Sequence, residues 1–209
     1  MAIKKLLLAL LAIGAMTACK DDTDDVLEQA QKDAATALLN GEMVVSAHTS
    51  INGADKTLLD GGAPCEFEFE PDGDGQLKLS MEDFQIGKMP FALYFKIKLS
   101  LGPILSFEKS DFSESGWVRF SGKRGVISFG GPMPEKWEDD SVEGDGSTVT
   151  GYVNTETKEI QFELYYAAMN VVVSVERQKI DPSRVANYET EKEEYEKALE
   201  EYKKEHGMQ

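Results

Sequence analysis

Few side chains in this sequence have the types and spacing that catalysis requires. The chain contains two histidines, His48 and His206, and neither stands in a motif with a nucleophile, so neither is predicted to act as a general base. Glu66, Glu68 and Glu70 alternate with phenylalanines, which is typical of the solvent-facing side of a β-strand rather than of a catalytic carboxylate cluster. We therefore predict that the protein is not an enzyme, and a hydrolase is the weakest alternative.

Two acidic segments are the nearest approach to a metal site. Residues 72–75, Asp-Gly-Asp-Gly, begin like a calcium-binding loop, but Leu77 stands at the sixth position, where such a loop needs glycine. The second segment contains Glu138, Asp139 and Asp140 and could hold a cation only weakly. The sequence therefore predicts neither a metal site nor a cofactor.

Aromatic residues between the expected strands are better candidates for binding. Trp137 stands beside Pro132 and Pro134, where an indole can form a contact platform for a glycan or an apolar molecule. The alternative is that this ring plugs one end of the domain. Trp117, at the start of an expected strand, is the second candidate. We predict these two residues as the ligand-binding residues, because loops on a rigid scaffold concentrate recognition.

Cys19 has the setting of a thiol that is acylated. Two lysines precede the apolar run of residues 6–13, which is too short to span a bilayer and is typical of a secretion signal. The sequence Met16-Thr17-Ala18-Cys19 resembles the lipobox of bacterial lipoproteins, although Met16 stands where leucine is commonest. The resemblance implies acyl chains such as palmitate on Cys19 and removal of residues 1–18. The alternative is an ordinary signal peptide with a coincidental cysteine.

The residues after Cys19 carry a second resemblance. Lys20-Asp21-Asp22 is similar to the signal with which one group of Gram-negative bacteria places lipoproteins on the outer face of the outer membrane. It implies an outer-membrane protein that is lipid-anchored at Cys19 and faces the cell exterior. The alternative is a solvated acidic linker.

Charge and cysteine content limit the partners and the fold. The chain has a formal net charge of −16, which argues against nucleic acid as a partner. Acylation of Cys19 would leave Cys65 without an internal disulfide partner. We therefore expect Cys65 to be a small buried hydrophobe.

Alternating apolar and polar residues from about 42 to 179 predict antiparallel strands joined as hairpins. The first hairpin pairs residues 65–70 with 76–81, with Phe69 opposite Leu77, Phe67 opposite Leu79 and Glu68 opposite Lys78. The second turns at 122–125, with Phe120 opposite Ile127 and Val118 opposite Phe129. The third turns at 155–158, with Val153 opposite Ile160 and Gly151 opposite Phe162. Residues 91–101 and 170–176 predict further strands.

This organisation predicts a mainly β fold, an antiparallel up-and-down barrel or a sandwich, with eight to ten strands. The chain resembles the calycin-like, lipocalin-type barrels of secreted bacterial lipoproteins. The segments that carry the resemblance are residues 41–45, 77–84 and the closing 151–153, 160–162 and 171–173. The resemblance covers 42–180 and implies the barrel. The expected inward side chains are Phe67, Phe69, Phe95, Ile97, Phe120, Ile127, Phe129 and Phe162, which could fill an eight-stranded barrel.

Two amphipathic helices flank the expected barrel. Residues 23–40 predict a short helix between the lipid and the barrel, capped by 21–25 and stopped by Gly41. Asp181-Pro182-Ser183 predicts the start of a C-terminal helix with a tyrosine-rich stripe, which either packs on the barrel or protrudes to recruit a partner. The expected organisation is signal peptide 1–18, tether and short helix 19–41, barrel 42–180 and C-terminal helix 181–209.

Function is predicted from this placement. We expect a surface-tethered, non-enzymatic module whose barrel mouth binds a small apolar molecule or a glycan. The alternative is an interaction or assembly subunit of an outer-membrane complex that uses the C-terminal helix to contact a protein partner. The volume of the barrel interior distinguishes the two hypotheses, because only the binding module needs an open cavity.

Overall fold

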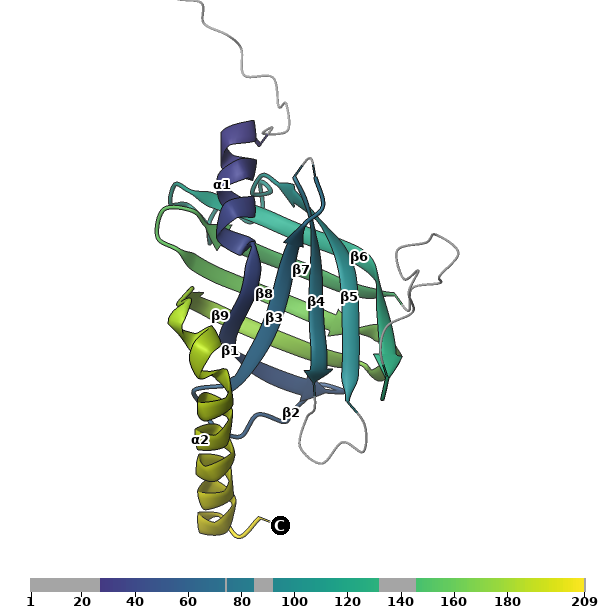
Figure 1. Ribbon diagram of the computed structural model, residues 1–209, viewed down its shortest axis with the longest axis vertical. Helices are drawn as coiled ribbons and strands as arrows, with labels where there is room; N and C mark the ends of the chain where they lie inside the picture. Colours follow the sequence, from purple (N-terminus) through teal and green to yellow (C-terminus); the bar gives the residue numbers. More distant parts are fainter. Residues whose placement is uncertain (1–26, 74, 85–91, 132–145, 209) are drawn as a thin grey trace, which may run out of the picture.

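Helices stand at the two ends of the described chain, and strands fill the part between them (Figure 1). The computed structural model describes residues 27–73, 75–84, 92–131 and 146–208. The elements are α1 (Gln29–Leu39), β1 (Gly41–Ile51), β2 (Ala54–Asp55), β3 (Ala63–Pro71), β4 (Gln76–Phe84), β5 (Leu93–Gly102), β6 (Trp117–Phe129), β7 (Ser147–Asn154), β8 (Glu159–Tyr166), the 3-10 turn η1 (Ala167–Met169), β9 (Val171–Lys179) and α2 (Ser183–Glu205). The prediction of a mainly β protein with a short first helix and a C-terminal helix is confirmed.

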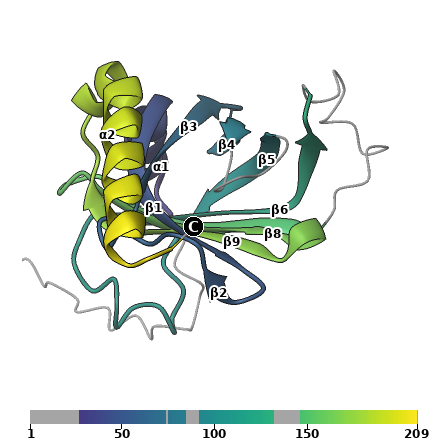
Figure 2. The same ribbon diagram turned by 90° about the horizontal axis from the view of Figure 1, so that it is seen from below.

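The strands form a closed antiparallel barrel. Strands β3 to β9 pair in chain order, and β1 pairs with both β3 and β9, which closes the sheet on itself (Figure 2). β2 is a two-residue addition to the end of β1 and contributes no wall. Up-and-down topology is therefore confirmed, and the sandwich is excluded.

The hairpin of β7 and β8 has the predicted register. Val153 lies opposite Ile160, and Gly151 lies opposite Phe162. The turn is short and closes with Lys158 at a φ of 60° and its amide donating to the carbonyl of Asn154 at 3.0 Å. The four-residue connection is the 155–158 turn that the sequence predicts.

The predicted register of β3 and β4 is wrong by two residues, although both faces are right. Phe69 lies opposite Leu79, and Lys78 lies opposite Glu70 instead of Glu68. The turn is shorter than expected, because the Asp72 amide donates to the Gln76 carbonyl at 2.9 Å. A shift of two residues keeps every side chain on its face, so matching apolar with apolar could not detect it.

The predicted hairpin at 122–125 does not exist, because β6 runs straight through it. Phe120 pairs with Leu101 of β5 and with Gly151 of β7, while Ile127 pairs with Phe95. The register shifts around residues 123–125, where Arg124 has a φ of 64°. The two glycines of this segment serve close packing instead of a turn, since a Cβ on Gly122 would lie 2.3 Å from the Lys98 carbonyl oxygen.

Large side chains fill the described interior of the barrel. Six of the eight predicted inward residues are buried: Phe67, Phe69, Phe95, Ile97, Phe120 and Phe162. Ile127 is half-buried, and Phe129 is a wrong prediction, since it is 50% exposed at the end of β6. Cys65 is buried and free, as predicted. The aromatic rings meet edge to face, which suits their quadrupoles.

The barrel has two distinct ends. The α1 end carries α1, the turns 72–75 and 155–158, and the loop 103–116. The α2 end carries the connection 52–62, η1, and the ends of β4 and β6. α2 begins beside the barrel and continues past this end (Figure 1).

Both helices start close to, but not at, the expected residues. α1 begins at Gln29, later than the predicted residue 23, and the Glu28 amide donates to Gln31 Oε1 at 3.2 Å as part of its cap. At α2, Asp181 Oδ1 accepts from the Ser183 amide at 2.9 Å and from the Ser183 hydroxyl at 2.7 Å. Asp181 therefore stabilises the start of the helix, as the sequence predicts.

The wall of the barrel is interrupted between β3 and β4. These strands pair only from Glu68 to Pro71 on β3, near the α1 end. Toward the α2 end, residues 63–67 of β3 pair with β1 alone, while β4 continues along β5 as far as Phe84. The two strands diverge like the sides of a wedge, and α2 packs against β1 and β3 beside it (Figures 1 and 2).

Candidate functional site

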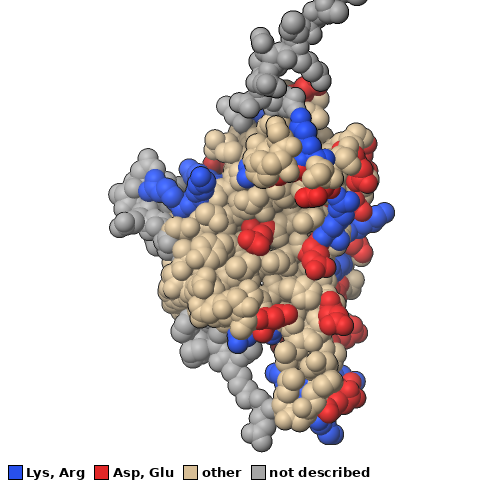
Figure 3. Space-filling view, turned by 180° about the vertical axis from the view of Figure 1, so that it is seen from behind, with Lys and Arg blue, Asp and Glu red and all other residues tan. Residues whose placement is uncertain are grey.

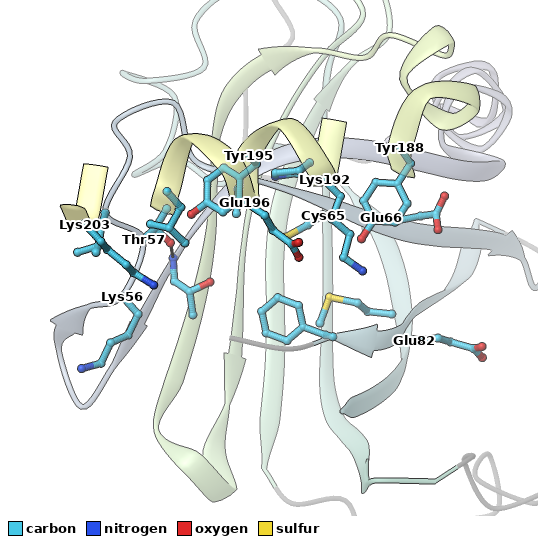
Figure 4. A pocket seen from close by; sticks show the side chains of 17 residues that line it. Lys56, Thr57, Cys65, Glu66, Glu82, Tyr188, Lys192, Tyr195, Glu196 and Lys203 are labelled. Atoms are coloured by element: carbon cyan, nitrogen blue, oxygen red, sulfur yellow. Dashed lines mark hydrogen bonds between the residues drawn. The ribbon is translucent and has the colours of Figure 1, made fainter. Parts of the chain in front are cut away.

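A pocket of about 240 Å³ lies in this wedge, between α2 and the ends of β3 and β4 (Figure 4). We call it the β3–β4 pocket. Its lining residues come from four parts of the chain: Thr49 of β1; Lys56, Thr57 and Leu58 of the following connection; Ala63, Pro64, Cys65, Glu66, Met81, Glu82 and Phe84 of β3 and β4; and Tyr188, Lys192, Tyr195, Glu196, Leu199 and Lys203 of α2. Its volume equals that of about eight water molecules, which suits a small ligand.

The floor of the β3–β4 pocket is apolar and reaches the barrel core. Met81 and Cys65 are almost fully buried and belong to the core, and Phe84 packs against it. Phe84 stacks on the buried Tyr166 with ring centroids 6.5 Å apart. Burial raises the pKa of the Cys65 thiol to about 12. Cys65 is therefore an uncharged apolar surface here and not a nucleophile.

Charged side chains surround this floor unevenly. Lys56 and Lys203 lie on one side of the pocket, and Glu66 and Glu82 lie on the opposite side (Figure 4). Burial, followed by the charges of nearby glutamates, raises the pKa of Glu66. The carboxylates of Glu66 and Glu82 make this side of the pocket the acidic one. The pocket is thus polarised across its length.

Helix α2 is held beside the wedge by a polar anchor at its first turn. Arg184 donates to Glu191 Oε2 at 2.7 Å and reaches the Ser46 hydroxyl of β1 at 3.3 Å. Gln178 of β9 also bonds to Ser46, donating to its carbonyl at 2.8 Å. Beyond this anchor, α2 has half-buried tyrosines and no fully buried residue. The helix is therefore fixed at its start and lightly packed along the pocket.

Trp117, predicted to contact ligand, is buried in a separate cluster outside the barrel wall. Its ring is 5% exposed, lies 5.1 Å from the Phe112 ring and has the Arg177 guanidinium 4.6 Å above it. Phe112 also stacks on Tyr152 at 3.8 Å. The structure therefore gives Trp117 a packing role, in which it fastens the loop 103–116 onto β6, β7 and β9.

Glu108 completes this outer cluster. Its Oε1 accepts from the Tyr152 hydroxyl at 2.7 Å and from Arg119 Nε at 3.3 Å, and its Oε2 accepts from the Leu105 amide at 2.9 Å. Burial and then the bond to Glu108 raise the pKa of Tyr152 to about 12. Sequence reasoning missed Glu108, because a single acid in a polar loop carries no periodic signal.

Several predicted site residues fall elsewhere. Cys19 and Trp137, and the acidic segment after Trp137, lie outside the described residues. His48 lies half-buried on β1, and His206 stacks on Tyr202 at 4.1 Å. Glu66, Glu68 and Glu70 alternate along β3 with buried phenylalanines, as predicted. Within the described ranges, no group of three or more potential metal ligands occurs. None of the helices described there has the length and apolar character needed to cross a membrane.

The outer surface of the barrel has one face with few charges. Seen from behind, most charged side chains lie at the margins of this face and along α2, and an acidic side chain lies near its middle (Figure 3). Outward positions on β7 to β9 explain this, since Thr148, Thr150, Tyr165, Val172 and Ser174 are uncharged and half-buried. The face has no hollow comparable with the β3–β4 pocket to orient a ligand, so we base the site on the pocket.

Comparison with known proteins gives one match. A family described as "Domain of unknown function (DUF4903)" matches residues 19–207. No curated protein and no solved structure matches the chain. The matched range includes α1, the whole barrel and α2. The chain therefore belongs to the DUF4903 family of domains of unknown function.

Proposed function

We propose that this chain is a lipid-anchored, non-enzymatic binding module on the exterior face of the outer membrane, which takes up a small apolar molecule or a glycan in the β3–β4 pocket. The observation that carries the proposal is the wedge between β3 and β4. The described barrel interior is filled by aromatic side chains, yet the wedge opens a path from the surface to Met81 and Phe84. A ligand can therefore bury an apolar part without displacing the core.

The placement of the pocket supports the proposed tether. The described chain enters at the α1 end, and the β3–β4 pocket lies toward the α2 end (Figure 1). The family match begins at Cys19, the residue predicted to carry the acyl chains. A chain anchored through Cys19 and α1 would present the pocket away from the membrane, where ligands arrive.

Aromatic side chains give the site a means of holding a ring. Tyr188 and Tyr195 line the pocket from α2, and the floor residue Phe84 lines it from β4. Aromatic faces of this kind pack on both apolar molecules and sugar rings. Trp137 remains a predicted contact. The strand ends that flank its segment, Phe129 and Ser147, lie at the α2 end of the barrel.

Filling the β3–β4 pocket from α2 should weaken binding without disturbing the fold. Leu199 lines the pocket from a helix that has no fully buried residue, so Leu199→Trp adds bulk where the core is not affected. We expect the variant to bind the uncharged fluorescent probe N-phenyl-1-naphthylamine about tenfold more weakly, measured by fluorescence titration. The full chain carrying Cys19→Ala is used, so that acyl chains and detergent do not compete.

The matched control is Ala198→Trp, which places the same side chain on the exposed neighbouring position of α2. This control should bind the probe as the parent chain does. Equal probe binding by the Leu199→Trp variant and the parent would remove the pocket from the proposal.

The tether has its own test. Cys19→Ala removes the thiol to which the acyl chains would be attached, so the protein should leave the membrane fraction or accumulate as the precursor. Cell fractionation with mass measurement of the product distinguishes these outcomes. Stable anchoring depends on the acyl chains of Cys19, and even one acyl chain alone holds a protein only marginally. Cys65→Ala is the control, since that thiol is buried in the barrel. Unchanged membrane retention of the Cys19→Ala variant would refute the anchor.

The second candidate function is a subunit of an outer-membrane assembly. The observation that favours it is the last part of α2, which extends past the barrel with half-buried Leu199 and Tyr202 (Figure 1). A helix that projects in this way can lie in the groove of a partner. Leu199→Trp would then disturb assembly rather than small-molecule binding.

A further inference from the structure

The β3–β4 pocket holds three lysines that form no ion pair with any other residue that the structure describes: Lys56, Lys192 and Lys203. This is unusual for a chain with 38 acidic and 22 basic residues, in which cations readily find carboxylates. Lys192 lies 6.0 Å from the ring of Tyr188 and is partly satisfied by it. Lys56 and Lys203 have no such ring contact and lie together at one end of the pocket (Figure 4).

The carboxylates of the pocket do not neutralise this end. Glu82 is turned to Lys96, with 3.8 Å between Oε1 and Nζ, and Glu66 lies on the far side. Asp55, which precedes Lys56, accepts a hydrogen bond from the Thr57 amide at 2.9 Å. Glu196 lies between the two ends (Figure 4). Among the described residues, the ammonium groups of Lys56 and Lys203 thus lie beside an apolar floor without an ion-pair partner.

We propose that the β3–β4 pocket binds a small amphipathic anion, whose apolar part enters the wedge onto Met81 and Phe84 and whose anionic head is held by Lys56 and Lys203. This rests on the proposed function and adds the ligand class. The opposite orientation is disfavoured, because an anionic head at the far side would lie beside the carboxylates of Glu66 and Glu82. The pocket volume of about 240 Å³ limits the ligand to a short chain or a small aromatic molecule.

Three competitors of the same chain length separate the contribution of head-group charge to binding from that of apolar contact. Octanoate, octanol and octylamine differ only in their head groups, and each can be titrated as a competitor of N-phenyl-1-naphthylamine on the full chain carrying Cys19→Ala. We expect octanoate to compete about tenfold better than octanol. That ratio corresponds to about 1.4 kcal/mol, which two partly exposed ion pairs can supply together. Octylamine should compete least.

The lysine variants then assign the preference to residues. Lys56→Met with Lys203→Met keeps the side-chain length and removes both charges, and it should reduce the octanoate-to-octanol ratio to near one. Lys197→Met with Lys204→Met removes the same net charge from exposed positions of α2 outside the pocket, and it should leave the ratio unchanged. Circular dichroism melts on both double variants verify folding.

The possible results test the ligand class and the pocket separately. If octanol competes as well as octanoate, or if the control pair lowers the ratio as much as the pocket pair, the anion assignment is wrong while the pocket stands. If octylamine competes best, the glutamate end selects the ligand and the proposal is overturned. If none of the probes, including N-phenyl-1-naphthylamine, binds the parent chain, the proposed function fails together with the ligand class.

Discussion

Phe67→Ala should lower the free energy of unfolding by about 3–5 kcal/mol, the cost of truncating a buried aromatic ring. Phe67 is 1% exposed and meets Phe162 edge to face, with ring centroids 5.0 Å apart. It lies on β3 in the part that pairs with β1 alone, so no β4 residue is opposite to fill the void. In a domain of this size the loss corresponds to a decrease in melting temperature on the order of 10 °C.

Lys78→Ala on the facing strand is the comparison. Lys78 pairs with Asp72 at 3.4 Å on the solvent side of β4, and such an exposed pair contributes about 1 kcal/mol at most. Its cross-strand neighbour on β5 is another lysine, Lys98, which weakens the contribution further. Thermal melts that showed Lys78→Ala as the more damaging change would mean that the two faces of the hairpin are inverted.

Gly151→Ala should destabilise the barrel by about 1–3 kcal/mol, although it adds a single methyl group. A Cβ at this position would lie 2.2 Å from Phe120 Cζ and 2.5 Å from the Phe162 Cβ. Both rings are buried among other aromatic side chains and have little room to move. The measurement is the urea midpoint at equilibrium, with an unchanged slope.

Gly61→Ala is the matched control, since nothing lies within 4 Å of an added Cβ there. It should leave stability unchanged or raise it slightly by restricting the unfolded chain. If Gly151→Ala unfolds at the same midpoint as the Gly61→Ala control, the rings cannot be packed over Gly151 as described.

The sequence was sufficient for the type of fold and for most of the core. Strand alternation placed Phe67, Phe69 and Phe120 inside, because period-two patterns report which face is buried irrespective of pairing. Only the pairing of β7 with β8 was also right in register. For β3 and β4, two registers that differ by two residues match apolar with apolar side chains equally well, and the predicted register was the wrong one of the two.

Glycine spacing misled the reading of β6. Gly122 and Gly125 suggested a turn, but these residues stand where neighbouring backbone and the Phe95 ring come too close for a Cβ. Both uses of glycine depend on a missing side chain, and a single sequence does not distinguish them. The pairs of Phe120 with Leu101 and with Gly151 show that β6 is one continuous strand, and these pairs join residues far apart in the sequence.

The candidate site could not be predicted from local pattern at all. It exists because β3 and β4 stop pairing after Glu68, and the point at which two strands separate is set by their other neighbours, β1 and β5. Lys56 and Lys203 are far apart in sequence and meet only through the path of α2 (Figure 4). The tyrosine stripe of α2 was the one available signal, because it marked the side of the helix that faces the barrel.

The wedge between β3 and β4 also bears on how this molecule avoids its own copies. A fully paired barrel presents no strand edge. In the part of the chain that the structure describes, residues 63–67 of β3 have no partner strand on one side, and such an edge is a template for intermolecular β-pairing. α2 lies along this edge and is rich in glutamate, so an approaching strand meets both a steric cover and repulsion. By covering this edge, the helix should hinder aggregation through β-pairing. The β3–β4 pocket lies beneath the helix, where α2 does not touch the sheet.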